Sequence, residues 1–138
     1  MTGLLSIGKT KDTKTFELLD PITEEVLKNA DGSPMTITVY GPYASAYALR
    51  ISEMNRDELN EKASSGETKL TDDEIEDRML RSAAAKIADW RITIDKDPEP
   101  FSVEKAIEVL RQFRYVMFQV LAEVGNTENF FDKSNVNC

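Results

Sequence analysis

The sequence predicts an α+β fold, in which a small N-terminal antiparallel sheet of two or three strands is followed by a helical portion of about four helices. Two observations carry this prediction. Up to about residue 42, apolar side chains alternate with polar ones, as they do in half-buried strands. From residue 43 onward they recur every three or four residues, which is the spacing of one helix face. The 138 residues suit a single domain over 1–138.

Within this domain the pattern divides the chain into four parts. Residues 1–14 are small, polar and lysine-bearing, so we expect a loose N-terminal arm. The β-rich part covers 15–42 and the helical part covers 43–125. The remaining tail, 126–138, is polar apart from two adjacent phenylalanines.

The β-rich part contains two strand signals on either side of a turn. Alternation places Phe16 and Leu18 on one face of the first strand. Asp31-Gly32 predicts a turn, because glycine adopts positive φ without strain. The second strand, 35–40, is rich in β-branched residues and turns its apolar side chains to one face: Met35, Ile37 and Val39.

The helical part begins with a face that continues to about residue 62 and carries Tyr43, Tyr47, Ile51 and Met54. Thr71 and Glu74 form a capping box, which predicts the start of a second helix that ends near Asp89. We expect this helix to bury four residues at steps of four: Ile75, Met79, Ala83 and Ile87.

Two further helices follow a proline-containing loop. Ser102 is a suitable N-cap for the third helix, because its hydroxyl can accept a hydrogen bond from a free N–H of the first turn. The last helix is expected over about 114–124. Trp90 is expected to close the preceding helix, and Phe101 to reach back toward it. We therefore assign structural roles to Trp90, Phe101 and Ser102.

The charge balance limits the classes of partner. The chain has 17 basic and 25 acidic side chains and a net charge of -8. Such a surface repels phosphate backbones and anionic lipids, so we expect neither nucleic acid nor membrane as a partner. The acidic stretch 53–81 is most simply a solvated helix surface, although it could also attract a basic partner.

The residue inventory disfavours an enzyme. Histidine is absent from the sequence, which removes the commonest general base and every His-based zinc site. The lone cysteine, Cys138, cannot form an internal disulfide, which suits a reducing compartment. The sequence also lacks a phosphate-cradling glycine motif and a GxSxG elbow. We expect no catalytic residue and no cofactor.

Three carboxylates in the loop after Trp90 are candidates for a metal site. A calcium loop that starts at Asp95 would use Asp95, Asp97 and Glu99 as oxygen ligands. It would also need glycine at its sixth position and a bidentate glutamate at its twelfth, where the sequence has Pro100 and Ala106. The sequence therefore predicts no metal site here.

The order of these motifs resembles the tail assembly chaperone family of long-tailed, siphovirus-type bacteriophages. The resemblance rests on "MTITVYGPYASAY", then "AAAKIADW", then "IDKDPEPFS", then "EKAIEVLRQFRYVMFQVLAEVGNTENFF". It runs from about residue 16 to residue 131, and the order and spacing of the motifs are more specific than any one of them.

This resemblance implies a non-catalytic protein that binds and solubilises the tape measure protein during tail morphogenesis. Such a chaperone acts in the host cell cytoplasm and is not expected in the mature virion. It is also expected to self-associate, and a longer frameshifted form recruits tail tube protein. The alternative from the same gene neighbourhood is a structural minor tail or tube-associated virion protein.

Aromatic side chains are the candidates for partner contacts, because aromatics dominate interface energetics. The two phenylalanines of the tail have no predicted helix to bury them, so we expect them to be the most exposed. The candidates for partner binding are Tyr43, Tyr47, Tyr115, Phe118, Phe130 and Phe131.

Overall fold

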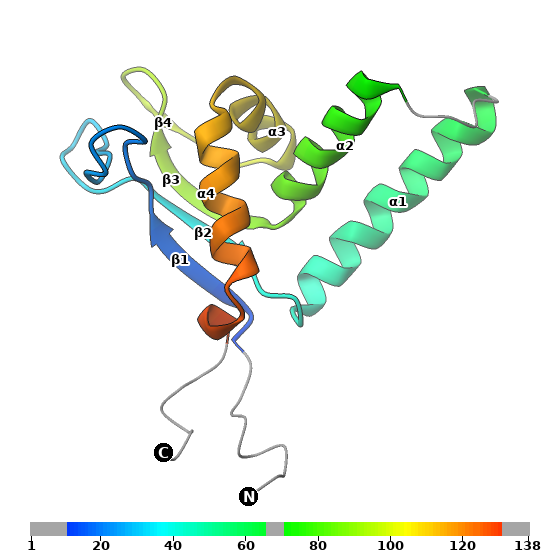
Figure 1. Cartoon of the computed structure of the whole chain (residues 1–138), viewed down its shortest axis with the longest axis horizontal. Coiled ribbons are helices and arrows are strands. Elements are labelled where there is room, and N and C mark those ends of the chain that lie inside the picture. The colour runs from blue at the N-terminus through cyan, green and yellow to red at the C-terminus, as the bar shows by residue number, and fades with distance from the viewer. Residues whose placement is uncertain (1–10, 66–70, 131–138) are drawn as a thin grey trace, which may run out of the picture.

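The computed structural model describes residues 11–65 and 71–130, and over these ranges it contains a four-stranded antiparallel sheet and four α-helices (Figure 1). The predicted α+β class is confirmed, although the sheet is larger than expected and its strands are interleaved with helices. The elements in chain order are β1 (Thr13–Glu17), β2 (Thr36–Tyr40), α1 (Ser45–Ser65), α2 (Asp72–Ala85), β3 (Ile87–Thr93), β4 (Pro98–Glu99), α3 (Val103–Gln112), α4 (Arg114–Gly125) and the 3₁₀ helix η2 (Thr127–Phe130).

The sheet has the strand order β1-β2-β3-β4. Its centre is β2, the strand that the sequence predicted most directly: Ile37 and Val39 are fully buried, while Thr36, Thr38 and Tyr40 alternate on the other face. The register between β2 and β3 shifts between Thr38 and Val39, which marks a β-bulge in this pair.

Helices α2, α3 and α4 pack on one face of the sheet, with α4 against β2 and α2 against β3 (Figure 1). The opposite face is polar where β1 meets β2, since the hydroxyl oxygens of Thr15 and Thr38 lie 2.7 Å apart there. The core takes side chains from the sheet and from all three helices, among them Phe16, Leu18, Ile37, Val39, Leu80, Ala84, Ile87, Trp90, Leu110, Val116 and Val120.

The second predicted helix is shorter than expected. α2 starts at the predicted capping box, where the Thr71 hydroxyl accepts a hydrogen bond from the N–H of Glu74 at 3.2 Å. It ends at Ala85 rather than near Asp89, because Ile87–Thr93 pairs with β2 as strand β3. The three alanines at 83–85 remain in α2, whereas the strand segment contains residues that favour strands, such as Ile87, Trp90 and Ile92.

The part of the chain predicted to be helical, 43–125, therefore contains two strands. Trp90 does not close a helix, because it lies in the middle of β3 and is paired with Ile37 of β2. The short strand β4 returns along β3 and pairs with Ile92 and Thr93. The proline-containing loop is thus the turn of a β3–β4 hairpin.

The two C-terminal helices agree with their sequence signals. The Ser102 hydroxyl accepts a hydrogen bond from the N–H of Lys105 at 3.0 Å and caps α3. Helix α4 ends at Gly125, within a residue of the predicted end. Phe113 separates the two helices, as the C-cap of α3 and the N-cap of α4.

Both ends of the described chain are more ordered than the sequence predicted. Residues 13 and 14, predicted to belong to an N-terminal arm, lie in β1, and residues 1–10 of that arm lie outside the described part. In the tail, η2 places Phe130 in the core with 0% of its surface exposed, which corrects its predicted exposure. Gly41 makes this possible, because a Cβ there would lie 2.6 Å from Cδ1 of Phe130.

Candidate functional site

Helix α1 stands apart from the helices that cover the sheet (Figure 1). None of its described side chains belongs to the buried core cluster, and the helix with which it makes most contacts is α2. The helix begins at Ser45, so Tyr43 precedes it instead of lying on its first turn. The first helix of the sequence pattern is therefore present but lies largely outside the core.

Arg50 joins α1 to the end of α2 and the start of β3. Nη1 of Arg50 donates to the carbonyl oxygens of Ala85, at 3.2 Å, and Ile87, at 2.5 Å. Its guanidinium carbon lies 5.2 Å from the ring centroid of Tyr40 and 6.0 Å from that of Phe101. Charge-assisted hydrogen bonds and cation–π contacts thus join the start of α1 to the end of α2.

Large apolar side chains of this region are exposed to solvent. We call them the α1–α2 apolar surface; its members are Tyr43, Leu49, Ile75 and Met79. Ile75 and Met79 lie one turn apart and so share a face of α2. An exposed apolar face on a helix is one kind of site at which another protein can dock.

The exposure of Ile75 and Met79 corrects the prediction that they point into the core. The other two residues of the predicted series, Ala83 and Ile87, are fully buried as expected, and Leu80 and Ala84 are buried beside them. Burial of Leu80, Ala83 and Ala84 sets this rotation, and it also brings Asp77 to Arg111 of α3, at 2.5 Å, and Glu76 to Arg114 of α4. The sequence does not show these pairs, because the positions of α3 and α4 relative to α2 cannot be read from it.

Acidic side chains accompany the apolar ones. The first turn of α2 carries Asp72, Asp73 and Glu74, and the first two of these are exposed. Negative charge near a helix N-terminus is favourable for the helix itself, which gives these residues a local role. The same charges make the outer end of α2 a surface that attracts cationic side chains.

The predicted aromatic contacts do not come together on one surface. Tyr43 and Phe118 are exposed, and Phe118 keeps 64% of its surface in solvent. Tyr47 is half-buried, and this burial raises the pKa of its hydroxyl. Tyr115 is also half-buried, and its ring packs edge-on against Phe113 with centroids 6.2 Å apart. Phe131 lies outside the described residues.

Two of the residues with predicted structural roles, Trp90 and Phe101, pack together at the β3–β4 hairpin. The rings of Trp90 and Phe101 are perpendicular, with centroids 5.2 Å apart. Nε1 of Trp90 donates to the carbonyl oxygen of Glu99 at 2.8 Å. Phe101 therefore reaches Trp90 as expected, and the indole fixes the returning strand.

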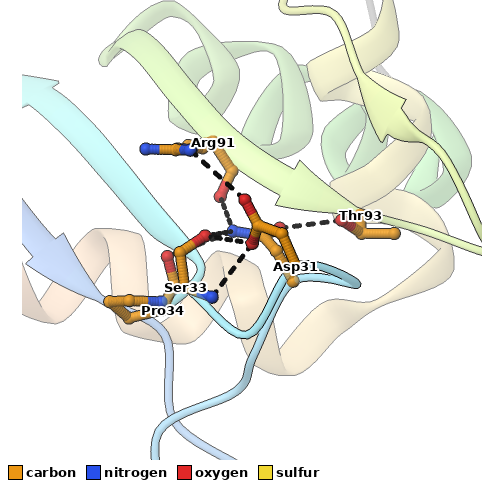
Figure 2. Close-up of polar contacts among 6 residues, drawn as sticks. Asp31, Ser33, Pro34, Arg91 and Thr93 are labelled. Atoms are coloured by element: carbon orange, nitrogen blue, oxygen red, sulfur yellow. Dashed lines mark hydrogen bonds and ion pairs between the residues drawn. The ribbon is translucent and has the colours of Figure 1, made fainter.

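A groove of about 320 Å³ lies beside this cluster, between the 29–31 turn and the β3–β4 hairpin. Figure 2 shows the polar network at its rim, which includes Pro34, Arg91 and Thr93. The hydrogen bonds of this network meet at Asn29. The Asn29 amide donates to the Arg91 carbonyl at 3.3 Å and to the Pro34 carbonyl at 3.2 Å, and it accepts from the Thr93 hydroxyl at 2.9 Å.

Asp31 completes this network. Its carboxylate accepts hydrogen bonds from the hydroxyl and the N–H of Ser33, at 2.5 and 2.9 Å, and lies 3.5 Å from Arg91 (Figure 2). These bonds, chiefly that from the Ser33 hydroxyl, lower the pKa of Asp31. The polar side chains of this rim hydrogen-bond to one another. The rim therefore attaches the 29–31 turn to strand β3.

The loop carboxylates give no metal site in the described structure. Asp95 and Asp97 are exposed, and Glu99 pairs with Lys105 at 3.5 Å. Within residues 11–65 and 71–130, no group of three or more His, Cys, Asp or Glu side chains is placed to hold a metal ion.

Comparison with protein-family models, curated proteins and solved structures finds no match to this chain. In the part of the chain that the structure describes, no helix is both long and apolar enough to cross a membrane.

Proposed function

We propose that this chain is a non-catalytic tail assembly chaperone of a long-tailed bacteriophage, which binds and solubilises the tape measure protein during tail morphogenesis. One observation carries the proposal: the α1–α2 apolar surface exposes Leu49, Ile75 and Met79 on helices that contribute little or only one face to the core. The resemblance of the sequence motifs to this chaperone family supports it.

The proposed partner surface has the chemistry that a long amphipathic helix would need. Such a helix buries its apolar stripe against exposed apolar side chains of its receptor, here those of α1 and α2. The net charge of -8 keeps the complex soluble while apolar surface is being covered. Methionine in particular adapts its shape to different partners, which suits Met79 to successive segments of one long chain.

The test is co-expression with the tape measure protein encoded in the same genome. We expect the partner to gain soluble yield and to co-purify with this chain. The double variant Ile75→Ser with Met79→Ser should lose co-purification while it keeps the wild-type unfolding temperature, because both side chains are already exposed.

The matched control is Ile22→Ser, which also removes an exposed apolar side chain but lies in the turn after β1, with 89% of its surface exposed. It should bind as the wild type does. Wild-type protein that neither raises the soluble yield nor co-purifies would contradict the proposal.

Mass spectrometry of purified phage particles separates the chaperone from the structural alternative. A chaperone that works in the host cytoplasm should be missing from the particles. Detection in stoichiometric amounts would favour a minor tail or tube-associated virion protein.

A further inference from the structure

Strand β1 forms one edge of the sheet, and its backbone groups point to two sides. On the inner side, the Leu18 N–H donates to the Met35 carbonyl oxygen at 2.9 Å, and the Asp12 carbonyl oxygen accepts from the Gly41 N–H at 2.8 Å. Because successive strand residues point their N–H and C=O to opposite sides, the even-numbered residues face β2 and the odd-numbered residues face outward. Such outward groups can pair with another extended chain.

The side chain of Gln119, on helix α4, covers the outward groups of Leu19, two residues beyond the end of β1. Its Nε2 donates to the Leu19 carbonyl oxygen at 2.8 Å, and its Oε1 accepts from the Leu19 N–H at 2.9 Å. A residue of a neighbouring antiparallel strand would make the same two kinds of hydrogen bond. The amide of Gln119 therefore takes the place of a neighbouring strand at this position.

At the other end of the edge, the backbone of η2 occupies the same kind of position. The Lys11 N–H donates to the carbonyl oxygen of Phe130 at 2.6 Å. Between these two contacts, no hydrogen bond from the described residues reaches the outward backbone groups of Thr13, Thr15 or Glu17. The open stretch of the edge is therefore the five residues of β1.

Strand β4, at the opposite edge of the sheet, is closed by different means. It has two residues, Pro98 and Glu99, and Pro100 follows it. The two prolines have no N–H to donate, and the carbonyl oxygen of Glu99 already accepts from Nε1 of Trp90. Short strands and prolines are common ways in which proteins prevent pairing at a sheet edge. In the described sheet, β1 is therefore the edge at which a strand could be added.

We propose that Gln119 prevents strand addition at β1 by shortening the open edge. With the amide in place, the open stretch has five residues. Without it, the stretch would run from Thr13 to Leu19, which is seven residues. Segments that assemble into intermolecular β-structure have roughly six or seven residues. Gln119 thus keeps the open stretch below the length at which such assembly begins.

The residues of the longer stretch favour intermolecular pairing once the edge is open. Residues 13–19, TKTFELL, include β-branched and aromatic side chains, which favour strands. The charges of Lys14 and Glu17 cancel, and the stretch contains no proline or glycine. Low net charge and the absence of proline are features of segments that form β-assemblies. This role of Gln119 is independent of the partner that the α1–α2 apolar surface binds.

Gln119→Ala is the first test, and its matched control is Gln112→Ala, which truncates an exposed glutamine of α3. Concentrated samples are followed by thioflavin T fluorescence and by sedimentation velocity. Gln119→Ala should accumulate at least about tenfold more thioflavin-positive material than the wild type or Gln112→Ala. Amide hydrogen exchange measured by NMR should also be faster at Leu19 in Gln119→Ala alone, because that N–H has lost its acceptor.

Thr15→Pro in the Gln119→Ala background is the second test, and it separates strand addition from a general loss of stability. Proline removes an outward N–H that no group of the described chain accepts, so it blocks pairing at β1. The matched control is Thr15→Val in the same background, which also loses the hydroxyl contact with Thr38 but keeps the N–H. The proline variant should suppress assembly, and the valine variant should not.

Circular dichroism checks that each variant is folded. A folded Gln119→Ala variant that forms no more assemblies than the wild type overturns the proposal, and so does assembly without faster exchange at Leu19. A folded proline variant that assembles like the valine variant overturns it as well. If the proline variant does not fold, the comparison of Gln119→Ala with Gln112→Ala decides the question.

Discussion

The sheet and helices α2, α3 and α4 form a body with buried apolar side chains in its core. The apolar side chains of the α1–α2 apolar surface are instead exposed to solvent. Leu110 of α3 is a leucine with 0% of its surface exposed, whereas Leu49 of α1 is a leucine with 63% exposed. Both lie in helices of the same chain. The difference shows that helix amphipathicity here serves two purposes, closing a core and presenting a surface.

The two regions also differ in the polar contacts that attach their helices. Around the body, ion pairs join α2 to α3 and α4 through Asp77 and Glu76. Helix α1 depends instead on Arg50, which reaches two backbone carbonyls beside the sheet.

The largest expected effect comes from the same substitution made in each region. Leu110→Ala should lower the free energy of unfolding by about 2–5 kcal/mol, because it leaves a cavity in a closed core. Leu49→Ala should change it by less than about 0.5 kcal/mol, because water already surrounds that side chain. Chemical denaturation of both variants measures the difference. Equal losses would show that α1 is packed as tightly as the body.

The second-largest effect is expected at the contact between Gly41 and Phe130, where η2 packs against the core. Gly41→Ala places a Cβ 2.6 Å from Cδ1 of Phe130 and 3.0 Å from the Lys11 carbonyl oxygen, so it should cost about 1–3 kcal/mol. Gly125→Ala is the control, because a Cβ there meets nothing within 4 Å and favours the helix. Thermal unfolding should show a lower midpoint for Gly41→Ala only, with partial recovery on adding Phe130→Leu.

The contact between Phe130 and Gly41 could not be predicted from the sequence. Phe130 lies in a polar stretch after the last helix, and only Gly41, far away in the chain, reveals the space that the ring fills. A local pattern contains no information about a contact between residues so distant in sequence. The predicted exposure of Phe130 was therefore a reasonable inference from the tail, and it was wrong.

The predictions that held depend on contacts within a few residues. The alternation in β2, the capping hydroxyls of Thr71 and Ser102, and the positive φ of Gly32 are all local. The predictions that failed required a choice between two plausible local patterns. Ile75 with Met79 and Leu80 with Ala84 both have helical spacing, and only the packed helices decide which pair is buried.

A smaller effect is expected at the anchor of α1. Arg50→Met removes the hydrogen bonds to the Ala85 and Ile87 carbonyls and should cost about 1 kcal/mol. The control Arg81→Met removes a pair between exposed groups on α2 and should cost less than about 0.5 kcal/mol. Hydrogen exchange should quicken along α1 for Arg50→Met alone; unchanged exchange would mean that α1 is held by other contacts.

The smallest effect is expected at the 29–31 turn, which the hydrogen bonds of Asn29 attach to β3. The Ser33 hydroxyl holds the pKa of Asp31 below its ordinary value of 3.8. A carboxyl whose pKa is lower in the folded state stabilises the protein at pH values above the unfolded pKa, and the benefit disappears as pH falls through the folded pKa. Ser33→Ala should therefore raise the pKa of Asp31, and a carbon-detected NMR titration of the carboxyl would show it.

The accompanying loss of stability should be slight, because Asp31 and Arg91 are both exposed and their attraction across 3.5 Å is screened by water and salt. Asp31→Asn should accordingly leave the unfolding midpoint at neutral pH almost unchanged, since the amide oxygen can still accept from Ser33. A large loss would mean that this turn supports the core as Leu110 does. The contrast would then lie between α1 and everything else, and the groove beside Trp90 would belong to the rigid body.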